Sequence, residues 1–270
     1  MKKLLLLGAS GLVGKALVKE CGDSFDVYGT YATRPLDLPG DKQYQLDISD
    51  KEKMKGVIQD IKPHVIISCL RGDFDQQLEF HRELAKEIEH TESTLYYFST
   101  ANVFDGDFTR HHAEEDKPNA ASPYGKFKVE CENLLQELLQ ERAVTIRIPQ
   151  IWGRNSPRLD QIKSGIKEGS MDVYSNLECN HLTDEWLAKQ LKYIILHERK
   201  GIFHLGAVDM MTQAQFVEEL VGCLTNKDIT FHDCLLEDKP ETFYFGLKSI
   251  RKDLPEHLVK TNREFIRDLL

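Results

Sequence analysis

A glycine-rich turn near the N-terminus constrains this chain more than any other feature of its sequence. The turn, GASGLVG at Gly8–Gly14, directly follows the apolar run Leu4–Leu7. An uninterrupted apolar run of this length is typical of a parallel strand that is covered on both faces. The residues after the turn, with Val13, Leu17 and Val18 on one face, have the spacing of a helix. The segment therefore predicts a strand, a tight turn and a helix, in that order.

Each glycine of this turn has a separate expected role. Gly8 lets the chain leave the strand sharply, Gly11 lets the backbone approach a pyrophosphate, and Gly14 lets the helix pack close to the sheet. The helix N-terminus then offers free N–H groups and a partial positive charge to phosphate groups. The spacing is GxxGxxG, whereas the commonest dinucleotide fingerprint is GxGxxG. We expect a dinucleotide site here; the alternative is a turn of the same shape that binds no ligand.

Apolar runs and helical patterns alternate along the first part of the chain. Further strands are predicted at 25–30, 44–46, 64–69, 95–98 and 144–148, and helices at 49–60, 78–90 and 124–140. A capping box of Ser49 and Glu52 opens the first of these helices. Strands separated by helices of this length indicate βαβ units with right-handed crossovers and a parallel sheet. The predicted fold class is α/β, a Rossmann-type doubly wound parallel sheet.

The alternation loosens after about residue 150. Helices are predicted at 183–196, 212–223 and 262–269, and strands at 201–205 and 229–231. We expect residues 1–155 to form a dinucleotide-binding core and residues 156–270 a smaller α/β lobe that binds the substrate. Because no linker separates them, the lobe should interleave with the core as a single compact unit.

Composition excludes several classes of partner. The formal net charge of −9 argues against a general nucleic-acid or anionic-membrane binder. No segment approaches the ~18 consecutive apolar residues of a membrane span, and Leu4–Leu7 is too short for a signal peptide. The six cysteines are scattered, with no CxxC pair, so neither a zinc site nor a disulfide framework is indicated. Reduced thiols fit a cytoplasmic protein.

One cluster of metal-ligand residue types also needs an account. His111 and His112 are followed by Glu114, Glu115 and Asp116. Their spacing fits no known ligand template. We expect a solvated, charged loop at this position and no metal site in the protein.

The end of the second predicted strand bears on the choice of cofactor. In NAD-binding proteins an acid at this point holds the ribose hydroxyls, but the segment from Tyr28 to Arg34 contains none. Arg34, with Thr30 or Thr33, could instead hold a 2′-phosphate, which favours NADP(H) and leaves NAD(H) possible. The alternative is that Arg34 is a solvated loop residue. After the third strand, Asp47 and Ile48 could bracket an adenine ring, unless the aspartate only begins a helix.

A YxxxK sequence, Tyr124 to Lys128, begins the helix predicted at 124–140. Positions i and i+4 share one helix face, so both side chains can enter one cleft. An ammonium group near a phenol lowers the phenol pKa, which suits Tyr124 to protonate a carbonyl oxygen. The lysine could also hold a nicotinamide ribose. Ser99 and Thr100 end a predicted strand upstream, where a hydroxyl can hydrogen-bond the carbonyl and stabilise its developing charge.

Together these residues resemble the extended short-chain dehydrogenase/reductase family. The matching segments are GASGLVG at 8–14, Leu46–Ile48, FSTANVF at 98–104 and SPYGKFK at 122–128. Within the family the chain is most similar to the dTDP-4-dehydrorhamnose reductase branch. It is also similar to a non-catalytic offshoot of that branch, the regulatory subunit of methionine adenosyltransferase. The resemblance spans nearly the whole chain and is strongest up to about residue 154.

The resemblance implies roles for individual residues. Thr100, Tyr124 and Lys128 would form the catalytic trio. The pyrophosphate would be bound by Gly8, Ser10, Gly11, Leu12, Val13 and Gly14. Tyr124 and Lys128 would also contact the cofactor, and the C-terminal lobe would roof a substrate pocket. A homodimer through the Tyr124 helix is possible.

Three departures from the family pattern fall near the expected pockets. After the fourth strand, Ser68-Cys69-Leu70, followed by Arg71, replaces the usual Asn-Ala-Ala; we assign these first three residues to the cofactor site. Ala101 replaces an aspartate and Gln150 replaces a tryptophan. Ala101, Asn102 and Gln150 are therefore candidate substrate contacts.

The favoured hypothesis is an NAD(P)-dependent reductase acting on a carbonyl of a nucleotide-sugar-like substrate. One alternative is an epimerase or dehydratase on the same scaffold, which would recycle a bound cofactor. Another is a non-catalytic NADP-binding regulatory subunit.

Overall fold

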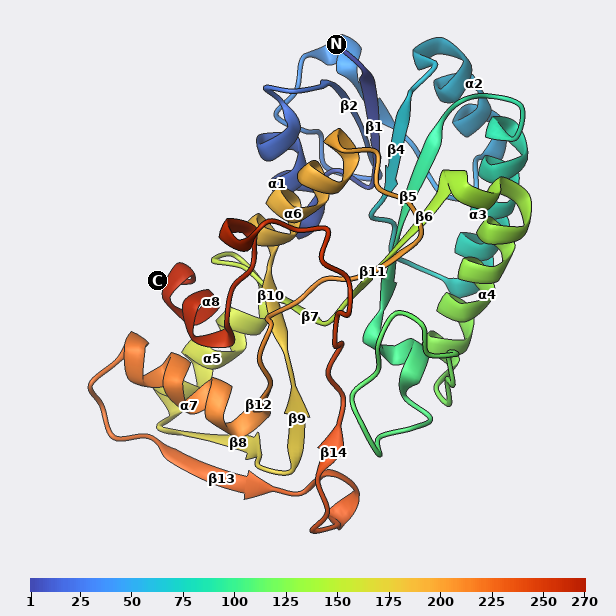
Figure 1. Cartoon of the computed structure of the whole chain (residues 1–270). Coiled ribbons are helices and arrows are strands. Elements are labelled where there is room, and N and C mark those ends of the chain that lie inside the picture. The colour runs from blue at the N-terminus through green and yellow to red at the C-terminus, as the bar shows by residue number, and fades with distance from the viewer.

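A seven-stranded parallel sheet forms the centre of the computed structural model, which describes all residues from 1 to 270 (Figure 1). Its strand order is β11-β6-β5-β4-β1-β2-β3. The strands are β1 (Lys3–Leu7), β2 (Asp26–Tyr31), β3 (Gln43–Gln45), β4 (Val65–Ser68), β5 (Thr94–Thr100), β6 (Ala143–Ile148) and β11 (Ile202–His204). The order runs outward in both directions from the β1–β4 pair, which creates a switch point between these two strands. The predicted Rossmann-type α/β fold is confirmed.

The register brings the carboxyl ends of the central strands to one edge. Leu7 of β1 lies beside Ser68 of β4, and Ser68 lies beside Tyr97 of β5. Thr100, the last residue of β5, pairs with Ile148, the last residue of β6. Ligands of open α/β sheets bind outside this edge at the switch point. The residues that follow β1, β4, β5 and β6 are therefore placed around one space.

Helices cover both faces of the sheet, which explains the uninterrupted apolar run of β1. Helices α1 (Leu12–Cys21) and α6 (Asp184–Leu196) cover one face. Helices α2 (Lys51–Ile61), α3 (Phe74–Ile88) and α4 (Pro123–Leu139) cover the other face. Leu4 and Leu6 pack under the first layer, and Leu5 and Leu7 under the second, because side chains alternate along a strand.

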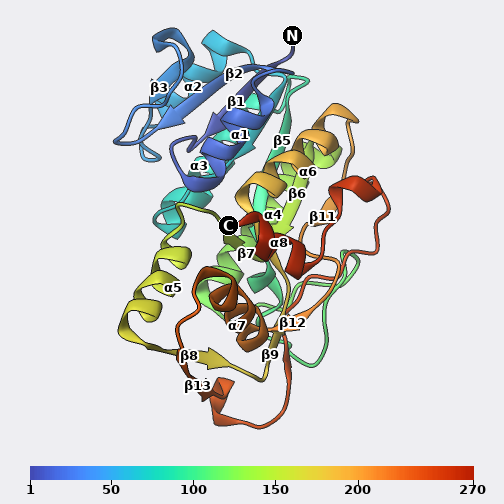
Figure 2. The ribbon, with the colours of Figure 1, turned by 90° about the vertical axis from the view of Figure 1, so that its left-hand side faces the viewer.

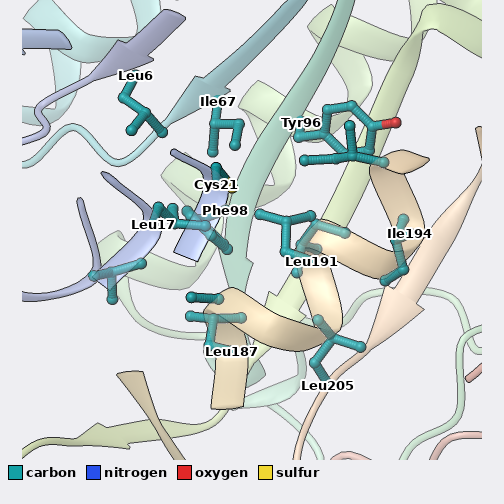
Figure 3. Close-up of a cluster of buried hydrophobic side chains, with 14 of the residues drawn as sticks. Leu6, Leu17, Cys21, Ile67, Tyr96, Phe98, Leu187, Leu191, Ile194 and Leu205 are labelled. Carbon is teal, nitrogen blue, oxygen red and sulfur yellow. The ribbon is translucent and has the colours of Figure 1, made fainter. Parts of the chain in front are cut away.

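The layer that contains α1 and α6 is shown in Figure 3. Leu6, Ile67 and Tyr96 point from three strands toward Leu17 of α1 and Leu191 of α6. A fully buried leucine of this kind contributes about 1.5–3 kcal/mol to the free energy of unfolding. Helix α6 belongs to this layer, and β11 is an edge strand of the central sheet. The chain beyond residue 155 therefore contributes elements to the core as well as to the region outside it.

The rest of the chain lies beyond the carboxyl edge of the sheet (Figure 2). It comprises α5 (Pro157–Glu168), α7 (Gln213–Leu224), α8 (Asn262–Asp268), β7 (Gln150–Trp152), β8 (Ser170–Tyr174), β9 (Leu177–Cys179), β10 (His181–Thr183), β12 (Met211–Thr212), β13 (Thr230–Cys234) and β14 (Phe243–Tyr244). These strands form three small sheets, ordered β10-β7, β12-β9-β14 and β13-β8. Residues from this region face the space at the sheet edge.

Two predicted helix starts are wrong by a few residues. Helix α2 is capped by Asp50, whose carboxylate accepts a hydrogen bond from the Lys53 N–H group, whereas the Ser49 hydroxyl donates to Asp47. Helix α3 begins at Phe74, four residues before the predicted start, after the cap Asp73. In both cases an aspartate supplies the cap. The capping box of Thr212 at the start of α7 is present.

The prediction of a solvated loop at His111–Asp116 is wrong, because two of its residues are buried. His112 is buried and stacks on Phe104, with ring centroids 4.4 Å apart. The buried Glu114 carboxylate accepts hydrogen bonds from the Ser249 hydroxyl at 2.6 Å and the Ile250 N–H group at 2.9 Å. The loop therefore anchors the C-terminal segment to the core. No helix is long and apolar enough to cross a bilayer.

Candidate active site

A cavity of about 800 Å³ opens at the carboxyl edge of the sheet, where the switch point predicts a ligand site. It is lined by the glycine turn, the ends of β2, β4 and β5, the segment around β7, the first residues of α4 and α5, and Phe245. Of the residues assigned from the sequence, all except Arg34 and Ser68 line the cavity. The assigned residues that line it are Gly8, Ser10, Gly11, Leu12, Val13, Gly14, Thr30, Asp47, Ile48, Cys69, Leu70, Thr100, Ala101, Asn102, Tyr124, Lys128 and Gln150.

The three glycines of the turn differ in what surrounds them. Gly8 has a φ of +78°, and a Cβ atom there would lie 3.1 Å from the Cys69 carbonyl oxygen. A Cβ atom on Gly14 would lie 2.6 Å from the Ala9 Cα atom, so α1 can approach the turn only with glycine. Gly11 has an ordinary φ of −74°, and its Cβ atom would meet only the Gly8 carbonyl oxygen, at 3.6 Å. The fold requires Gly8 and Gly14, whereas Gly11 leaves open a cradle on the cavity.

The N-terminus of α1 is available to a ligand. The other seven α-helices begin with an Asp, Ser or Thr side chain that accepts a backbone hydrogen bond, but α1 follows Gly11 and has no side-chain cap. The N–H groups of its first turn, Leu12 to Gly14, have no acceptor in the chain. Free N–H groups and the helix dipole fit a pyrophosphate in the cavity.

Thr30 and Arg34 occupy different environments. The buried Thr30 hydroxyl accepts a hydrogen bond from the Gly8 N–H group at 3.0 Å, so it supports the glycine turn. Arg34 is exposed in the loop after β2 and does not line the cavity. Asp47 lines the cavity, and hydrogen bonds from the Ser49 hydroxyl and N–H group lower the pKa of its carboxyl. The 2′-phosphate role of Arg34 stays a prediction.

The residues after β4 also divide. Cys69 and Leu70 line the cavity, but Ser68 is buried and its hydroxyl lies 2.7 Å from His81 Nε2. Ser68 therefore joins β4 to α3 and does not face the cavity. Burial raises the pKa of the Cys69 thiol to about 12, which keeps it neutral and unreactive.

The proposed catalytic trio converges on the cavity from two elements. Thr100 ends β5, and its hydroxyl donates to the Asn102 side-chain oxygen at 3.0 Å. Tyr124 and Lys128 lie one turn apart on α4 and both line the cavity. The buried Lys128 Nζ donates to the Phe98 carbonyl oxygen at 2.8 Å and lies 5.9 Å from the centroid of the Tyr124 ring. The ammonium group thus lies beneath the tyrosine, where it can reach a ligand.

The start of α4 is fixed against the short 3-10 helix η2 (Ala101–Phe104) that follows β5. Ser122 caps α4 by accepting from the Gly125 N–H group at 3.0 Å, and its hydroxyl also donates to Asp105. A Cβ atom on Gly125 would collide with the Asn102 carbonyl oxygen. Glycine therefore allows the close approach that brings Tyr124 next to the end of β5.

The electrostatics of Tyr124 differ from the prediction. Burial raises the pKa of Tyr124, and the Thr100 hydroxyl and the Arg71 charge oppose that rise. Burial also lowers the pKa of Lys128 to about 8. The net effect leaves the phenol protonated at neutral pH, as a proton donor requires. The cation that stabilises the phenolate in this arrangement is Arg71, whereas the sequence assigned that effect to Lys128.

The cavity contains residues that carry no motif. Arg71 follows Leu70, Arg158 is the second residue of α5, and Phe245 comes from the segment after β14. The side chain of Ser99 is buried at the cavity without a hydrogen-bond partner. No sequence signal marks Arg158 or Phe245, because their neighbours in space are distant along the chain. Arg71 could have been suspected as the next residue of a segment already assigned to the cofactor.

The sequence of the chain is similar to a family model and to curated proteins. The RmlD substrate binding domain model matches residues 1–232. A curated relative, methionine adenosyltransferase 2 subunit beta of Xenopus tropicalis, is 30% identical over 236 residues, covering 78% of this chain and 69% of that protein. The dTDP-4-keto-6-deoxy-D-glucose reductase of Streptomyces niveus is 24% identical over 229 residues, covering 74% and 71%.

Solved structures share the fold at lower sequence identity. A dTDP-4-dehydrorhamnose reductase of Clostridium acetobutylicum superposes with a TM-score of 0.81 at 21% identity, covering 99% of this chain and 98% of that one. The Bacillus anthracis dTDP-4-dehydrorhamnose reductase, solved in complex with NADP, superposes with a TM-score of 0.79 at 19% identity, covering 100% and 98%. These matches confirm the resemblance inferred from the sequence. The chain belongs to the family that the RmlD substrate binding domain defines.

Proposed function

We propose that this protein is an NADP-dependent reductase that converts a carbonyl group of a nucleotide sugar to an alcohol. One observation carries the proposal: Thr100, Tyr124 and Lys128 share a single cavity with the glycine turn and the uncapped N-terminus of α1. A dinucleotide on the turn and a carbonyl beside Tyr124 would therefore occupy one continuous space.

Relatives support the choice of substrate and cofactor. The Streptomyces niveus and Clostridium acetobutylicum proteins are named as reductases of dTDP-linked 4-keto or 4-dehydro sugars. The Bacillus anthracis structure contains NADP. In this chain the cavity residues of β2 and its following loop are Thr30, Tyr31 and Ala32, none of them an acid that would repel a 2′-phosphate. NADP(H) is therefore favoured, with NAD(H) as the second choice.

Each member of the trio has a distinct part in the reaction. The glycine turn and Lys128 would hold the reduced dinucleotide, which would supply a hydride for the carbonyl carbon. Tyr124 gives its phenolic proton to the oxygen as negative charge develops there. The Thr100 hydroxyl, at the end of β5, donates a hydrogen bond to the same oxygen. Arg71 holds positive charge near the tyrosine and stabilises the phenolate left after proton transfer, whereas Lys128 would hold the nicotinamide ribose.

Replacing the proton donor tests this assignment. Tyr124→Phe should lower kcat with dTDP-4-dehydrorhamnose and NADPH by about 100- to 10,000-fold, the usual contribution of a positioned acid. The Kd for NADPH, measured by calorimetry, should stay within about twofold. Tyr174→Phe, at an exposed tyrosine of β8 outside the cavity, is the matched control and should behave as the unaltered protein. Full activity in Tyr124→Phe would refute the proposed role.

A second candidate function follows from the other relatives. Similarity at 27–30% identity to methionine adenosyltransferase 2 subunit beta from several vertebrates favours a role as a subunit of that enzyme. A stable complex with a methionine adenosyltransferase catalytic subunit, seen by light scattering, together with no turnover of dTDP-linked 4-dehydro sugars, would favour this role over the reductase.

A homodimer through α4 is also a proposal. The exposed side chains of this helix beyond Tyr124 are polar: Lys126, Glu130, Asn133, Gln136 and Glu137. Such a face would give a polar interface, which is typical of weak or transient association.

A further inference from the structure

The cavity holds two arginines that lie outside the glycine turn and the YxxxK sequence. Arg71 lies between β4 and α3, and Arg158 lies in the first turn of α5. The two arginines therefore reach the cavity from segments that are distant in the sequence. Two cationic side chains on one cavity need a physical reason.

Neither guanidinium has a partner within the protein. Several other arginines are paired with acids: Arg147 with Glu132, Arg251 with Asp253 and Arg263 with Glu219. Arg71 and Arg158 form no ion pair and donate no hydrogen bond. Burial lowers the pKa of Arg158, and the positive charge of Arg71 adds to that effect. Two unpaired guanidiniums that line one cavity favour the binding of an anion there.

The acids of the cavity do not neutralise this pair. Two carboxylates line the cavity, those of Asp47 and Asp73. Asp47 accepts hydrogen bonds from Ser49, and Asp73 caps α3 by accepting from the Gln76 N–H group at 3.0 Å. Both carboxylates are thus held by their own loops, although the whole chain carries a net charge of −9. Lys128 adds a third cation to the same cavity.

We propose that Arg71 and Arg158 together bind the diphosphate group of a nucleotide ligand in this cavity. Planar guanidinium forks match phosphate oxygens bidentately, and two of them match the two negatively charged phosphates of a diphosphate. The inference rests on the proposed function, which brings two diphosphates into the cavity: the pyrophosphate of NADP and the diphosphate of the nucleotide sugar. The free N–H groups of α1 fit one of these diphosphates, and separate titrations with each ligand decide which of the two the arginines bind.

Binding measurements on arginine variants test the pair without relying on turnover. The variants are Arg71→Ala, Arg158→Ala and the double variant, with Arg71→Lys to keep the charge but remove the fork. One titration uses NADPH, and the other uses dTDP in the presence of saturating NADP. Arg267→Ala, an exposed arginine outside the cavity with no ion pair, is the matched control.

Each Ala variant should raise the Kd of one ligand by about 10- to 100-fold, the double variant by more, and Arg71→Lys by an intermediate factor. A change for dTDP assigns the pair to the substrate, and a change for NADPH assigns it to the cofactor; both support the site. Thermal stability should not fall in any variant, because the side chains have no partners to lose and their like charges disfavour each other. If the double variant binds both ligands within twofold of the unaltered protein, the site does not exist, whatever its activity. If the arginines govern binding but no carbonyl is reduced, only the proposed function fails.

Discussion

Gly11 and Gly14 lie three residues apart in one turn, yet only one of them is required by packing. Gly11→Val introduces a side chain that the backbone angles allow and that enters the cavity. The free energy of unfolding should change by less than about 0.5 kcal/mol, as for surface substitutions. The Kd for NADPH should rise by about 5- to 100-fold, since an overpacked contact costs about 1–3 kcal/mol. Calorimetry and urea unfolding measure the two quantities.

Gly14→Ala is the matched comparison and should show the reverse order of effects. Its Cβ atom would lie 2.6 Å from the Ala9 Cα atom, so α1 must shift away from the turn. The expected destabilisation is about 1–3 kcal/mol. Equal loss of stability in Gly11→Val and Gly14→Ala would mean that Gly11 is structural and that the cradle is not a ligand site.

Lys128 illustrates the conflict between stability and chemistry at a single residue. Burial lowers its pKa from 10.5 to about 8, so the folded state loses the proton at lower pH than the unfolded state. Between pH 8 and 10.5 the unfolded state binds more protons, and stability rises with pH through this range. Lys128→Met should therefore raise the free energy of unfolding at pH 7 by about 2–3 kcal/mol and abolish turnover.

The pH dependence separates this effect from ordinary repacking. The advantage of Lys128→Met over the unaltered protein should shrink as the pH of urea unfolding is raised from 7 to 10. Lys126→Met, at an exposed lysine of the same helix, should show no such trend. A constant difference at both pH values would show that the buried charge carries no cost.

At the scale of the element, the start of α4 is positioned by its contact with η2. Gly125→Ala places a Cβ atom against the Asn102 carbonyl oxygen and forces the helix outward, together with Tyr124. A displacement of about 1 Å can lower catalysis by about 100-fold, so kcat should fall by about 10- to 100-fold. Gly56→Ala, within α2 and with nothing nearby, should keep full activity and stabilise the protein by about 0.5–1 kcal/mol. Steady-state kinetics of both variants would decide the point; unchanged kcat in Gly125→Ala would contradict it.

The elements that the sequence predicted are those with strong local signals. Strands β1 and β4 have apolar runs because both faces of the sheet are covered, and α7 has a capping box. Helix α5 was missed, since only Leu159 and Gly165 are buried along its length. The short strands β7, β9 and β14 pair with distant segments, so their formation depends on tertiary contacts.

The residues of the site also differ in whether a local sequence pattern reveals them. The glycine turn and the Tyr124–Lys128 pair are local patterns, and the structure places them on one cavity. Arg158 lies on the helix that the sequence did not reveal, and the unpaired state of Arg71 is a property of its neighbours in space. The hydroxyls of Ser68 and Thr30 point to His81 and Gly8, contacts that only the assembled sheet defines.

At the scale of the whole molecule, three of the four buried histidines join segments that are distant in sequence. His81 of α3 lies beside Ser68 of β4, and His181 of β10 lies 3.2 Å from the Asn262 side chain of α8. His204 of β11 is buried near Arg147 of β6, with 3.3 Å between Nε2 and a guanidinium nitrogen. These contacts link the helix layer, the sheet and the C-terminal region.

Burial of these histidines predicts acid sensitivity of the whole fold. It lowers the pKa of His81 and His204 to about 4 and that of His181 to about 3, from 6.5. Below pH 6.5 these histidines bind protons in the unfolded state but stay neutral in the folded state. The stability present at neutral pH is therefore lost as the pH falls toward 4. Each histidine contributes about 3 kcal/mol to this loss.

The free energy of unfolding in urea should fall steeply from pH 7 to 4.5. In His81→Gln its slope against pH should decrease by the equivalent of one proton. His90→Gln, at an exposed histidine just beyond the same helix, should keep the slope of the unaltered protein. An equal slope in both variants would mean that His81 is protonated within the folded protein, and that the junction of α3 with β4 opens to water before the molecule unfolds.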